Sequence, residues 1–279
     1  MSTVTLIITT YNWPAALDKT LQSLLSQSRL PNEVIIADDG STSETKLLIE
    51  KYQSSVEKLG IKLLHSWQAD EGFRVSRSRN LAISKATSKY IICIDGDIIM
   101  DERFIADHMA RAVPGCFISG KRARLSEAYS RSILNTDTMP SRLSKGIARG
   151  REAAFRSTSL SKLFSKKTKS VAGVHSCNLS FWREDAIRVN GFNAAFVGWG
   201  AEDKEFCIRL VNSGLLNNEV KFTAVAYHIY HKESSKSMAA YNQDLFDATS
   251  KHSLAWCEKG LNEFMVLNHH KPTQLESQH

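Results

Sequence analysis

Short apolar segments alternate with amphipathic segments through about the first 110 residues, and no other feature constrains the fold as strongly. Pro14 can open a helix at its first turn, and leucines recur at helical spacing after it. Residues 90–94 are almost continuously apolar, which predicts a strand buried on both faces. The alternation predicts an α/β fold with a doubly wound, mostly parallel sheet. The expected strands span 4–9, 33–37, 61–64 and 90–94, and the expected helices span 14–25, 43–59 and 76–86.

The pattern loosens after Gly120. Residues 121–170 are polar, basic and rich in serine, with weak helical periodicity, so we expect a basic mobile insertion there. The two remaining segments, 1–120 and a smaller half at 171–279, are expected to share one core. In the second half we expect strand-like runs at 171–182 and 220–230, a helix at 202–211, and a closing helix at 239–256.

The net charge of +7 is concentrated in one part of the chain. Residues 121–169 contain 13 lysines and arginines against three acidic residues. A single basic block indicates a local anionic partner, such as a phosphate-bearing ligand or an anionic membrane surface. Nucleic acid is disfavoured as the partner, because only three aromatic side chains interleave with these basic residues.

The cysteines and the hydropathy bear on the cellular compartment. Five widely spaced cysteines with no C-x-x-C pair argue against a disulfide framework and favour a reducing environment. No apolar run approaches the roughly 18 to 20 residues that a membrane-spanning helix needs. We therefore expect a cytoplasmic protein, with peripheral contact at the inner face of the membrane through residues 121–169 as an additional hypothesis.

Polar residues follow three of the expected strands, at 9–12, 38–41 and 95–97. In an open parallel sheet, ligands bind beyond the carboxyl ends of the strands, so these three segments should converge. Asp95 and Asp97 flank Gly96, and two carboxylates so spaced can hold a hard cation that bridges phosphate oxygens. Taken alone, this segment equally fits a turn with two solvated acids.

These motifs occur in an order and at a spacing that resemble the family 2 glycosyltransferases of the GT-A fold. The resemblance rests on Thr-Thr-Tyr-Asn at 9–12, Asp-Asp-Gly-Ser at 38–41, the segment 72–80 ending in Arg-Asn, and Asp-Gly-Asp at 95–97. A second segment, Gly-Trp-Gly-Ala-Glu-Asp at 198–203, resembles the G-W-G-x-E-D motif of galactosyl- and N-acetylgalactosaminyltransferases, including bacterial chondroitin-polymerase-like enzymes. The two resemblances cover residues 3 to about 118 and about 171 to 232.

The resemblance implies a nucleotide-sugar-binding half at 1–120 and an acceptor and catalytic half at 171–279. Thr9 and Tyr11 would flank the nucleobase of the donor. Asp39, or else Asp38, would accept a hydrogen bond from the uracil imide. The competing interpretation of the aspartates is a turn that caps the following helix.

The resemblance also implies a Mn²⁺ or Mg²⁺ site. Arg79 would reach the uracil or the diphosphate of the donor, and Asn80 would hold the loop. Asp95 would approach the ribose or the metal. Asp97 would ligate the metal, with a histidine at the end of the 220–230 run as a further ligand. Spacing does not decide between His228 and His231. The resemblance favours His228, with His231 as the second candidate.

The carboxylates at 202–203 are the implied catalytic residues. Inversion needs one carboxylate that deprotonates the incoming hydroxyl. By resemblance Asp203 is this base and Glu202 binds sugar hydroxyls, while Trp199 offers a platform for a sugar ring. The competing interpretation is an acidic helix N-terminus stabilised by the helix dipole. His175 is not assigned a role.

The sequence as a whole predicts a metal-dependent inverting hexosyltransferase. It would move a hexose or N-acetylhexosamine, with galactose-type sugars favoured, from a UDP-sugar to a glycan or a lipid-linked glycan in bacterial-type surface polysaccharide synthesis. Two alternatives remain: a non-catalytic nucleotide- or glycan-binding scaffold, and a nucleotidyltransferase that forms sugar nucleotides. The nucleotidyltransferase is disfavoured because the first strand is followed by Thr-Thr-Tyr-Asn rather than by a glycine-rich, basic loop.

Overall fold

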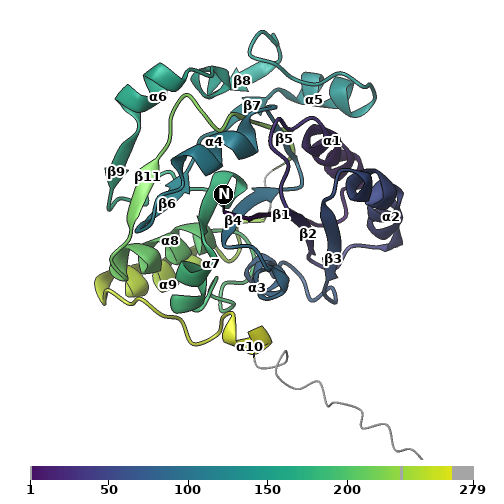
Figure 1. Ribbon diagram of the computed structural model, residues 1–279. Helices are drawn as coiled ribbons and strands as arrows, with labels where there is room; N and C mark the ends of the chain where they lie inside the picture. Colours follow the sequence, from purple (N-terminus) through teal and green to yellow (C-terminus); the bar gives the residue numbers. More distant parts are fainter. Residues whose placement is uncertain (1, 233–234, 266–279) are drawn as a thin grey trace, which may run out of the picture.

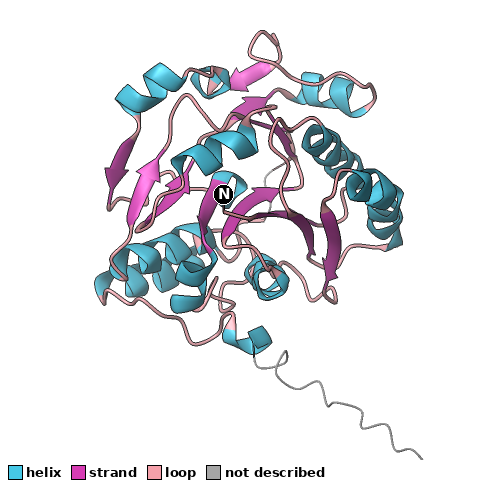
Figure 2. Ribbon diagram, in the orientation of Figure 1, coloured by secondary structure: helices cyan, strands magenta, loops and turns pink. Residues whose placement is uncertain are grey.

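The computed structural model describes residues 2–232 and 235–265 as an α/β structure built on two β-sheets (Figures 1 and 2). The larger sheet has eight strands in the order β3-β2-β1-β4-β10-β6-β11-β9. Its strands are β1 (Val4–Thr10), β2 (Glu33–Asp38), β3 (Lys62–Trp67), β4 (Tyr90–Asp95), β6 (Cys116–Ser119), β9 (Lys166–Thr168), β10 (Leu179–Trp182) and β11 (Leu216–Glu219).

The larger sheet is mostly parallel, as the sequence predicts. Strands β3, β2, β1 and β4 run parallel, β10 runs antiparallel between β4 and β6, and β11 pairs parallel with β6. In chain order, the helices are α1 (Pro14–Leu25), α2 (Ser43–Lys58), α3 (Val75–Lys85), α4 (Phe104–Arg111), α5 (Glu127–Leu134), α6 (Thr158–Phe164), α7 (Arg183–Arg188), α8 (Glu202–Asn212), α9 (Ala239–Lys251), α10 (Asn262–Met265) and the short 3-10 helices η1 (Arg151–Ala154) and η2 (Ser176–Asn178).

Helices cover both faces of the larger sheet. Side chains alternate along a strand, so Leu6 and Ile8 of β1 pack with α1, α2 and α4 while Ile7 packs with α3, α7 and α8. Each strand of the parallel half therefore contributes apolar residues to two separate clusters. This two-sided burial explains why those strands are apolar almost without interruption.

A second, four-stranded sheet has the order β5-β12-β7-β8. Its strands are β5 (Ile98–Met100), β12 (Ala226–His228), β7 (Ala123–Leu125) and β8 (Ile147–Arg149). Strand β5 follows directly after the turn at the end of β4, and β12 pairs with it antiparallel, His228 opposite Ile98. The small sheet thus brings the 226–231 segment to the carboxyl end of β4.

The second half differs in detail from the expectation. The 171–182 run forms a strand only at β10, preceded by η2. The 220–230 run is not one strand, because Phe222 and Ala224 adopt positive φ angles of 59° and 53° and leave only β12 extended. The closing helix ends at Lys251 rather than at residue 256, with Ser253 at a φ of 51° just beyond it.

The basic segment carries short elements of its own. It contains β7, α5, β8, η1, α6 and β9, and α5, β8 and α6 run along the top of the molecule in Figure 1. Its strands supply two members of the small sheet and the edge of the large one. The weak periodicity of this segment reflects elements of only three to eight residues. Its mobility stays a prediction.

All five cysteines are buried and free. Among the residues that the structure describes, none of the helices combines the length and the apolar character needed to cross a bilayer.

Candidate functional site

The ends of β1, β2 and β4 lie side by side in the larger sheet, as the sequence predicts. Thr9 of β1 lies opposite Asp95 of β4, and Thr10 lies opposite Asp38 of β2. Gly96 follows directly, and a Cβ there would lie 3.0 Å from the Thr9 carbonyl oxygen. The absence of a side chain at residue 96 therefore lets the Asp-Gly-Asp turn close over the end of β1.

Two aspartates at the end of β2 have different surroundings. Asp38 is fully buried, with its carboxylate hydrogen-bonded to His65 Nε2 at 2.7 Å and accepting from the Ser41 backbone N–H at 2.8 Å. Asp39 accepts from Gln68 Nε2 and from the Arg74 backbone N–H. Burial raises the pKa of Asp39 to about 6, against these two donors. Asp38 and Asp39 are both buried, so which of them meets the nucleobase stays a prediction, with Asp39 as the first candidate.

Tyr11 lies at the rim of the strand ends. Its side chain is 51% exposed, and its hydroxyl donates to Asp70 at 3.0 Å. The neighbouring Asn12 ties its loop to the loop after β2, since its N–H donates to Ser41 Oγ and its side-chain oxygen accepts from the Thr42 N–H. The aromatic face of Tyr11 is therefore held at an accessible edge, where a flat base could stack.

Asp97, His228 and His231 form a compact cluster. Asp97 Oδ2 lies 3.5 Å from His228 Nε2 and 3.3 Å from His231 Nε2, and one ligand atom from each of the three residues lies within 4.8 Å of the others. The Ile229 N–H donates to the Asp97 carbonyl oxygen at 3.0 Å, which fixes the histidine segment against the Asp-Gly-Asp turn. Both histidines that the spacing left open are thus brought to Asp97.

The chemistry of this cluster fits a divalent cation. Asp97 Oδ1 is buried without a hydrogen-bond partner, which is costly unless another group satisfies it. Burial and the nearby Arg122 lower the pKa of His228 to about 3, so its imidazole is neutral, as a ligand must be. His231 Nδ1 lies 2.8 Å from the Lys232 carbonyl oxygen. Donation from Nδ1–H to that oxygen leaves the Nε2 lone pair facing Asp97.

Arg79 connects the strand ends to the second half of the chain. Its buried guanidinium donates to Thr9 Oγ1 at 3.3 Å, Asp95 Oδ1 at 3.2 Å, Glu202 Oε1 at 3.1 Å and Ser176 Oγ at 2.8 Å. Burial alone would lower the pKa of Arg79, but Asp95 and Glu202 raise it above its ordinary value. Arg79 is only 3% exposed and joins these four groups. Its expected contact with the uracil or diphosphate stays a prediction.

Glu202 and Asp203 open α8 but meet different partners. Glu202 is paired with Arg79, whereas Asp203 accepts hydrogen bonds from the Ser176 N–H at 3.2 Å and its neighbour's N–H at 2.7 Å. Burial and the neighbouring Glu202 raise the pKa of Asp203 to about 7, against the opposing charge of Arg79. Asp203 therefore carries the carboxylate best matched to a proton exchange near neutral pH.

A left-handed backbone segment sets the position of these two carboxylates. Gly198, Gly200 and Ala201 have φ angles of 75°, 121° and 64°, and Ala201 is the residue that precedes α8. A non-glycine residue in this region is strained by roughly 1–2 kcal/mol, and such strain clusters at functional sites. Trp199 is 45% exposed between the glycines, so it is available as the expected platform for a sugar ring.

Asn80 holds a loop, as expected. Its side-chain oxygen accepts from the Phe192 N–H at 2.8 Å, and its Nδ2 donates to the Phe192 carbonyl oxygen at 2.6 Å. The Phe192 ring in turn lies 5.2 Å from the Arg79 guanidinium. This pairing fixes α3, and Arg79 with it, against the segment that leads to α8.

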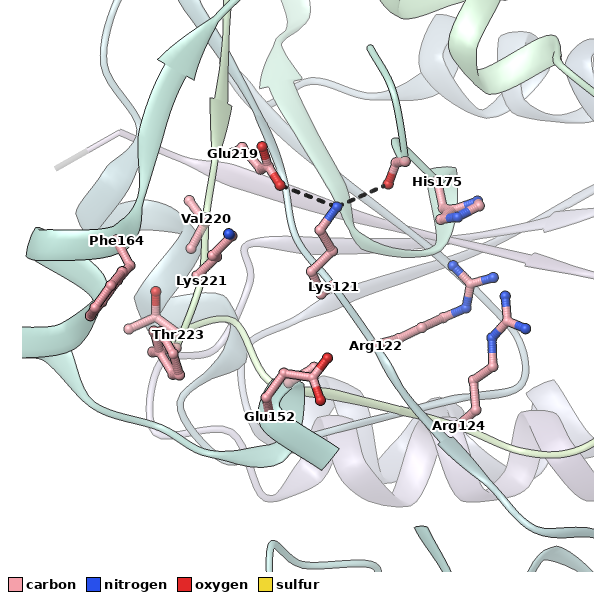
Figure 3. Close-up of a pocket in the computed structure, with 13 residues that line it drawn as sticks. Lys121, Arg122, Arg124, Glu152, Phe164, His175, Glu219, Val220, Lys221 and Thr223 are labelled. Atoms are coloured by element: carbon pink, nitrogen blue, oxygen red, sulfur yellow. Dashed lines mark hydrogen bonds and ion pairs between the residues drawn. The ribbon is translucent and has the colours of Figure 1, made fainter. Parts of the chain in front are cut away.

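Arg122 and Arg124, which lie within the basic block, are two further residues near the candidate site. Both line a cavity beside His175 (Figure 3). The Nδ1 atom of His175 is 3.8 Å from Asp203 Oδ2. Arg122 is also near enough to Asp97 to lower that residue's pKa, which burial and Asp95 raise. The signal that could have found them is their place directly after a strand, β6, whose end joins the same edge of the sheet.

Family models match the chain in two adjoining stretches. Residues 5–161 match glycosyl transferase family 2, and residues 159–232 match the N-terminal domain of galactosyltransferase. The first match alone covers more than half of the chain.

Curated relatives match most of this chain but only part of their own length. Validoxylamine A glucosyltransferase of Streptomyces hygroscopicus subsp. limoneus is 28% identical over 76% of this chain and 48% of its own. Chondroitin synthase of Escherichia coli is 27% identical over 81% of this chain and 34% of its own. The chain thus spans about a third to a half of these relatives.

Solved structures share the architecture. Staphylococcus aureus TarS 1–349 in complex with UDP aligns over 98% of this chain and 72% of its own, with a TM-score of 0.62 at 17% identity. The mannosyltransferase PcManGT from Pyrobaculum calidifontis, in complex with GDP-Man and Mn²⁺, aligns over 83% and 58% with a TM-score of 0.57 at 19% identity. The expected GT-A fold is confirmed.

We predict graded losses of metal binding. Asp97→Ala removes the only carboxylate of the cluster and should abolish Mn²⁺ binding measured by titration calorimetry with UDP present. His228→Ala and His231→Ala should each weaken Mn²⁺ binding at least about tenfold, the loss typical even of residues that only support a ligand. The exposed His252→Ala serves as the control. Unchanged Mn²⁺ affinity in all three cluster variants would show that this cluster does not bind the metal. If only one histidine variant weakens Mn²⁺ binding, that histidine is the ligand.

Proposed function

The chain belongs to glycosyl transferase family 2, and on this basis we propose that it is a metal-dependent inverting glycosyltransferase. It transfers a hexose or N-acetylhexosamine from a UDP-sugar to a hydroxyl of a glycan or lipid-linked glycan in bacterial-type surface polysaccharide synthesis. One observation carries the proposal: Arg79 ties Asp95, next to the candidate metal cluster, to Glu202, next to the candidate base. A non-catalytic binding scaffold would not need both a metal cluster and a base. It would also not need a residue that connects the two.

The donor lies across the carboxyl ends of β1, β2 and β4 in this proposal. Tyr11 and Thr9 flank the nucleobase, Asp39 accepts from it, and Asp95 faces the ribose. The exposed rim position of Tyr11 and the register of Thr9 opposite Asp95 support this placement. Ligand binding at this edge is general for open parallel sheets.

Asp97, His228 and His231 hold the metal. A divalent cation held by these three side chains would supply positive charge for the diphosphate of the donor. The residues of the chain contribute a partly buried set of one carboxylate and two imidazoles.

Asp203 takes the proton of the acceptor hydroxyl. The acceptor oxygen attacks the anomeric carbon opposite the diphosphate, the new glycosidic bond forms, and the diphosphate leaves with the electron pair of the broken bond. Glu202 is engaged by Arg79 and binds sugar hydroxyls rather than protons. Trp199 supports a sugar ring. A single displacement on an α-linked donor yields a β-linked product.

The galactose-type preference has a specific basis. Residues 159–232, which include the Gly-Trp-Gly-Ala-Glu-Asp segment, match the N-terminal domain of galactosyltransferase. Glucose is the second candidate, since one similar protein is a glucosyltransferase. Titration of UDP-galactose, UDP-glucose and their N-acetylamino counterparts in the presence of Mn²⁺ ranks these sugars directly.

We further propose that the basic segment contacts an anionic membrane at the cytoplasmic face. Leu163 at the end of α6 is 73% exposed, and Lys166, Lys167 and Lys169 follow it closely in the chain. Apolar side chains next to lysines are typical of surfaces that lie on anionic bilayers. A lipid-linked acceptor would be met at the same surface.

We predict that Asp203→Asn lowers turnover by roughly 10² or more and leaves donor affinity nearly unchanged. Asparagine keeps the shape and accepts the same N–H hydrogen bonds but takes no proton. UDP release measures turnover, and calorimetry with Mn²⁺ measures donor affinity. In the wild type, kcat/KM should rise with pH through about 7, because the base works only when deprotonated.

The matched control for this test is Glu184→Gln, which removes an exposed carboxylate from the first turn of α7. It should retain turnover and the pH profile. Collapse of donor binding in Asp203→Asn, with normal turnover per bound donor, would instead make Asp203 a donor-binding residue.

The membrane contact predicts that the triple variant of Lys166, Lys167 and Lys169 to alanine sediments poorly with anionic vesicles. Each lysine near such a surface contributes about 1 kcal/mol, and salt erases the effect. The control variant replaces Lys46, Lys51 and Lys58, which are exposed on α2. Unchanged sedimentation together with weakened donor binding would show that the basic segment covers the diphosphate instead.

A further inference from the structure

A cavity of about 490 Å³ opens beside the candidate base and lies outside the donor-binding strand ends. One wall begins at His175, next to Asp203, so the cavity reaches the place where an acceptor hydroxyl must lie. None of Thr9, Tyr11 or Asp39 lines it. Its volume is within the range of pockets that hold small ligands.

The cavity has a basic wall. Arg122 and Arg124 stand two residues apart at β7, so they share a face of that strand, and Figure 3 shows both guanidinium groups on the same side of the cavity near His175. Lys221 lines the cavity as well. Among the described residues, no carboxylate forms an ion pair with any of these three cations.

The acidic residues of the cavity do not balance this charge. Glu219 is already paired with Lys121 at 3.3 Å and Lys166 at 3.7 Å. Glu152 is the remaining carboxylate of the lining, against the three cations that form no ion pair. Like charges held together at a cavity wall favour an anionic ligand, because the ligand removes their repulsion.

The other wall is aromatic. The rings of Phe164 and Phe222 are 5.7 Å apart in an edge-to-face arrangement, and both residues line the cavity beside Val220. Aromatic and aliphatic surface of this kind packs against the apolar face of a sugar ring. The cavity thus offers both a platform for a ring and cations for a charged substituent.

Building on the proposed function, we propose that this cavity is the acceptor subsite and that the acceptor is an acidic glycan. Its carboxylate or phosphate lies against Arg122, Arg124 and Lys221 while its sugar ring packs on Phe164 and Phe222. The acceptor then reaches past His175, so that the hydroxyl to be glycosylated lies at Asp203. The basic charge of the cavity serves acceptor selection rather than donor binding.

The test uses the double variant Arg124→Gln, Lys221→Gln, which leaves Arg122 beside Asp97 unchanged. The probes are a disaccharide ending in a hexuronic acid, the same disaccharide with its carboxyl group reduced to a hydroxymethyl group, and a phosphorylated disaccharide. Binding to the protein loaded with Mn²⁺ and UDP is measured by calorimetry, and transfer is measured by UDP release. Arg149→Gln is the control, since it removes an arginine from the neighbouring strand β8 that does not line the cavity.

In the wild type and in Arg149→Gln, a charged disaccharide should bind at least about tenfold more tightly than its reduced counterpart. The double variant should lose this preference and keep its donor affinity. Preference for the uronate or for the phosphate identifies which anion the site takes. Equal binding of charged and reduced disaccharides, or weakened UDP binding in the double variant, would overturn the proposal. Selective binding without transfer from any donor would overturn the proposed function and leave the acidic subsite standing.

Discussion

The geometry of the site depends on one buried guanidinium. Arg79 donates to groups on four separate segments, namely Thr9 of β1, Asp95 after β4, Ser176 of η2 and Glu202 of α8. A buried charge is tolerable only when it is paired and hydrogen-bonded, so each of these segments must keep its place for the others to keep theirs. The strand ends of the first half and the helix start of the second half are thereby fixed as one site.

The four carboxylates of the site have different partners and therefore different roles in the proposed reaction. Asp95 and Glu202 face Arg79, while Asp97 and Asp203 do not pair with it and remain for a metal ion and a proton. Burial raises the pKa of Asp97 to about 8 and that of Asp203 to about 7. In the proposed reaction, charge accumulates on the diphosphate beside Asp97 and a proton arrives at Asp203. The two groups act at opposite ends of one displacement.

Local patterns in the sequence predicted the first half well. Strand and helix periods are set by neighbouring residues, and the strand-end rule brought Thr9 and Asp95 to one edge without knowledge of the register. The ends of the second half were predicted less well, because Phe222 and Ala224 adopt left-handed conformations that their residue types do not signal. The sequence therefore predicted a single strand over residues 220–230.

Long-range pairing set the other limits of prediction. The resemblance favoured His228 over His231, but the pairing of β12 with β5, across more than 120 residues, brings both to Asp97. Arg122 and Arg124 were interpreted as part of a solvated basic block because their cavity is assembled from β7, η1, the end of α6, the chain before η2 and the chain after β11. Such sites are properties of the folded chain rather than of any sequence window.

The configuration of the product tests the central claim most directly, namely that one base and one metal cluster perform a single displacement. NMR of the glycoside formed from an α-linked UDP-sugar reports the anomeric configuration of the new bond. The account predicts a β-linked product throughout the reaction. An α-linked product would contradict it, because retention by double displacement needs a nucleophile at the anomeric carbon in addition to the base Asp203.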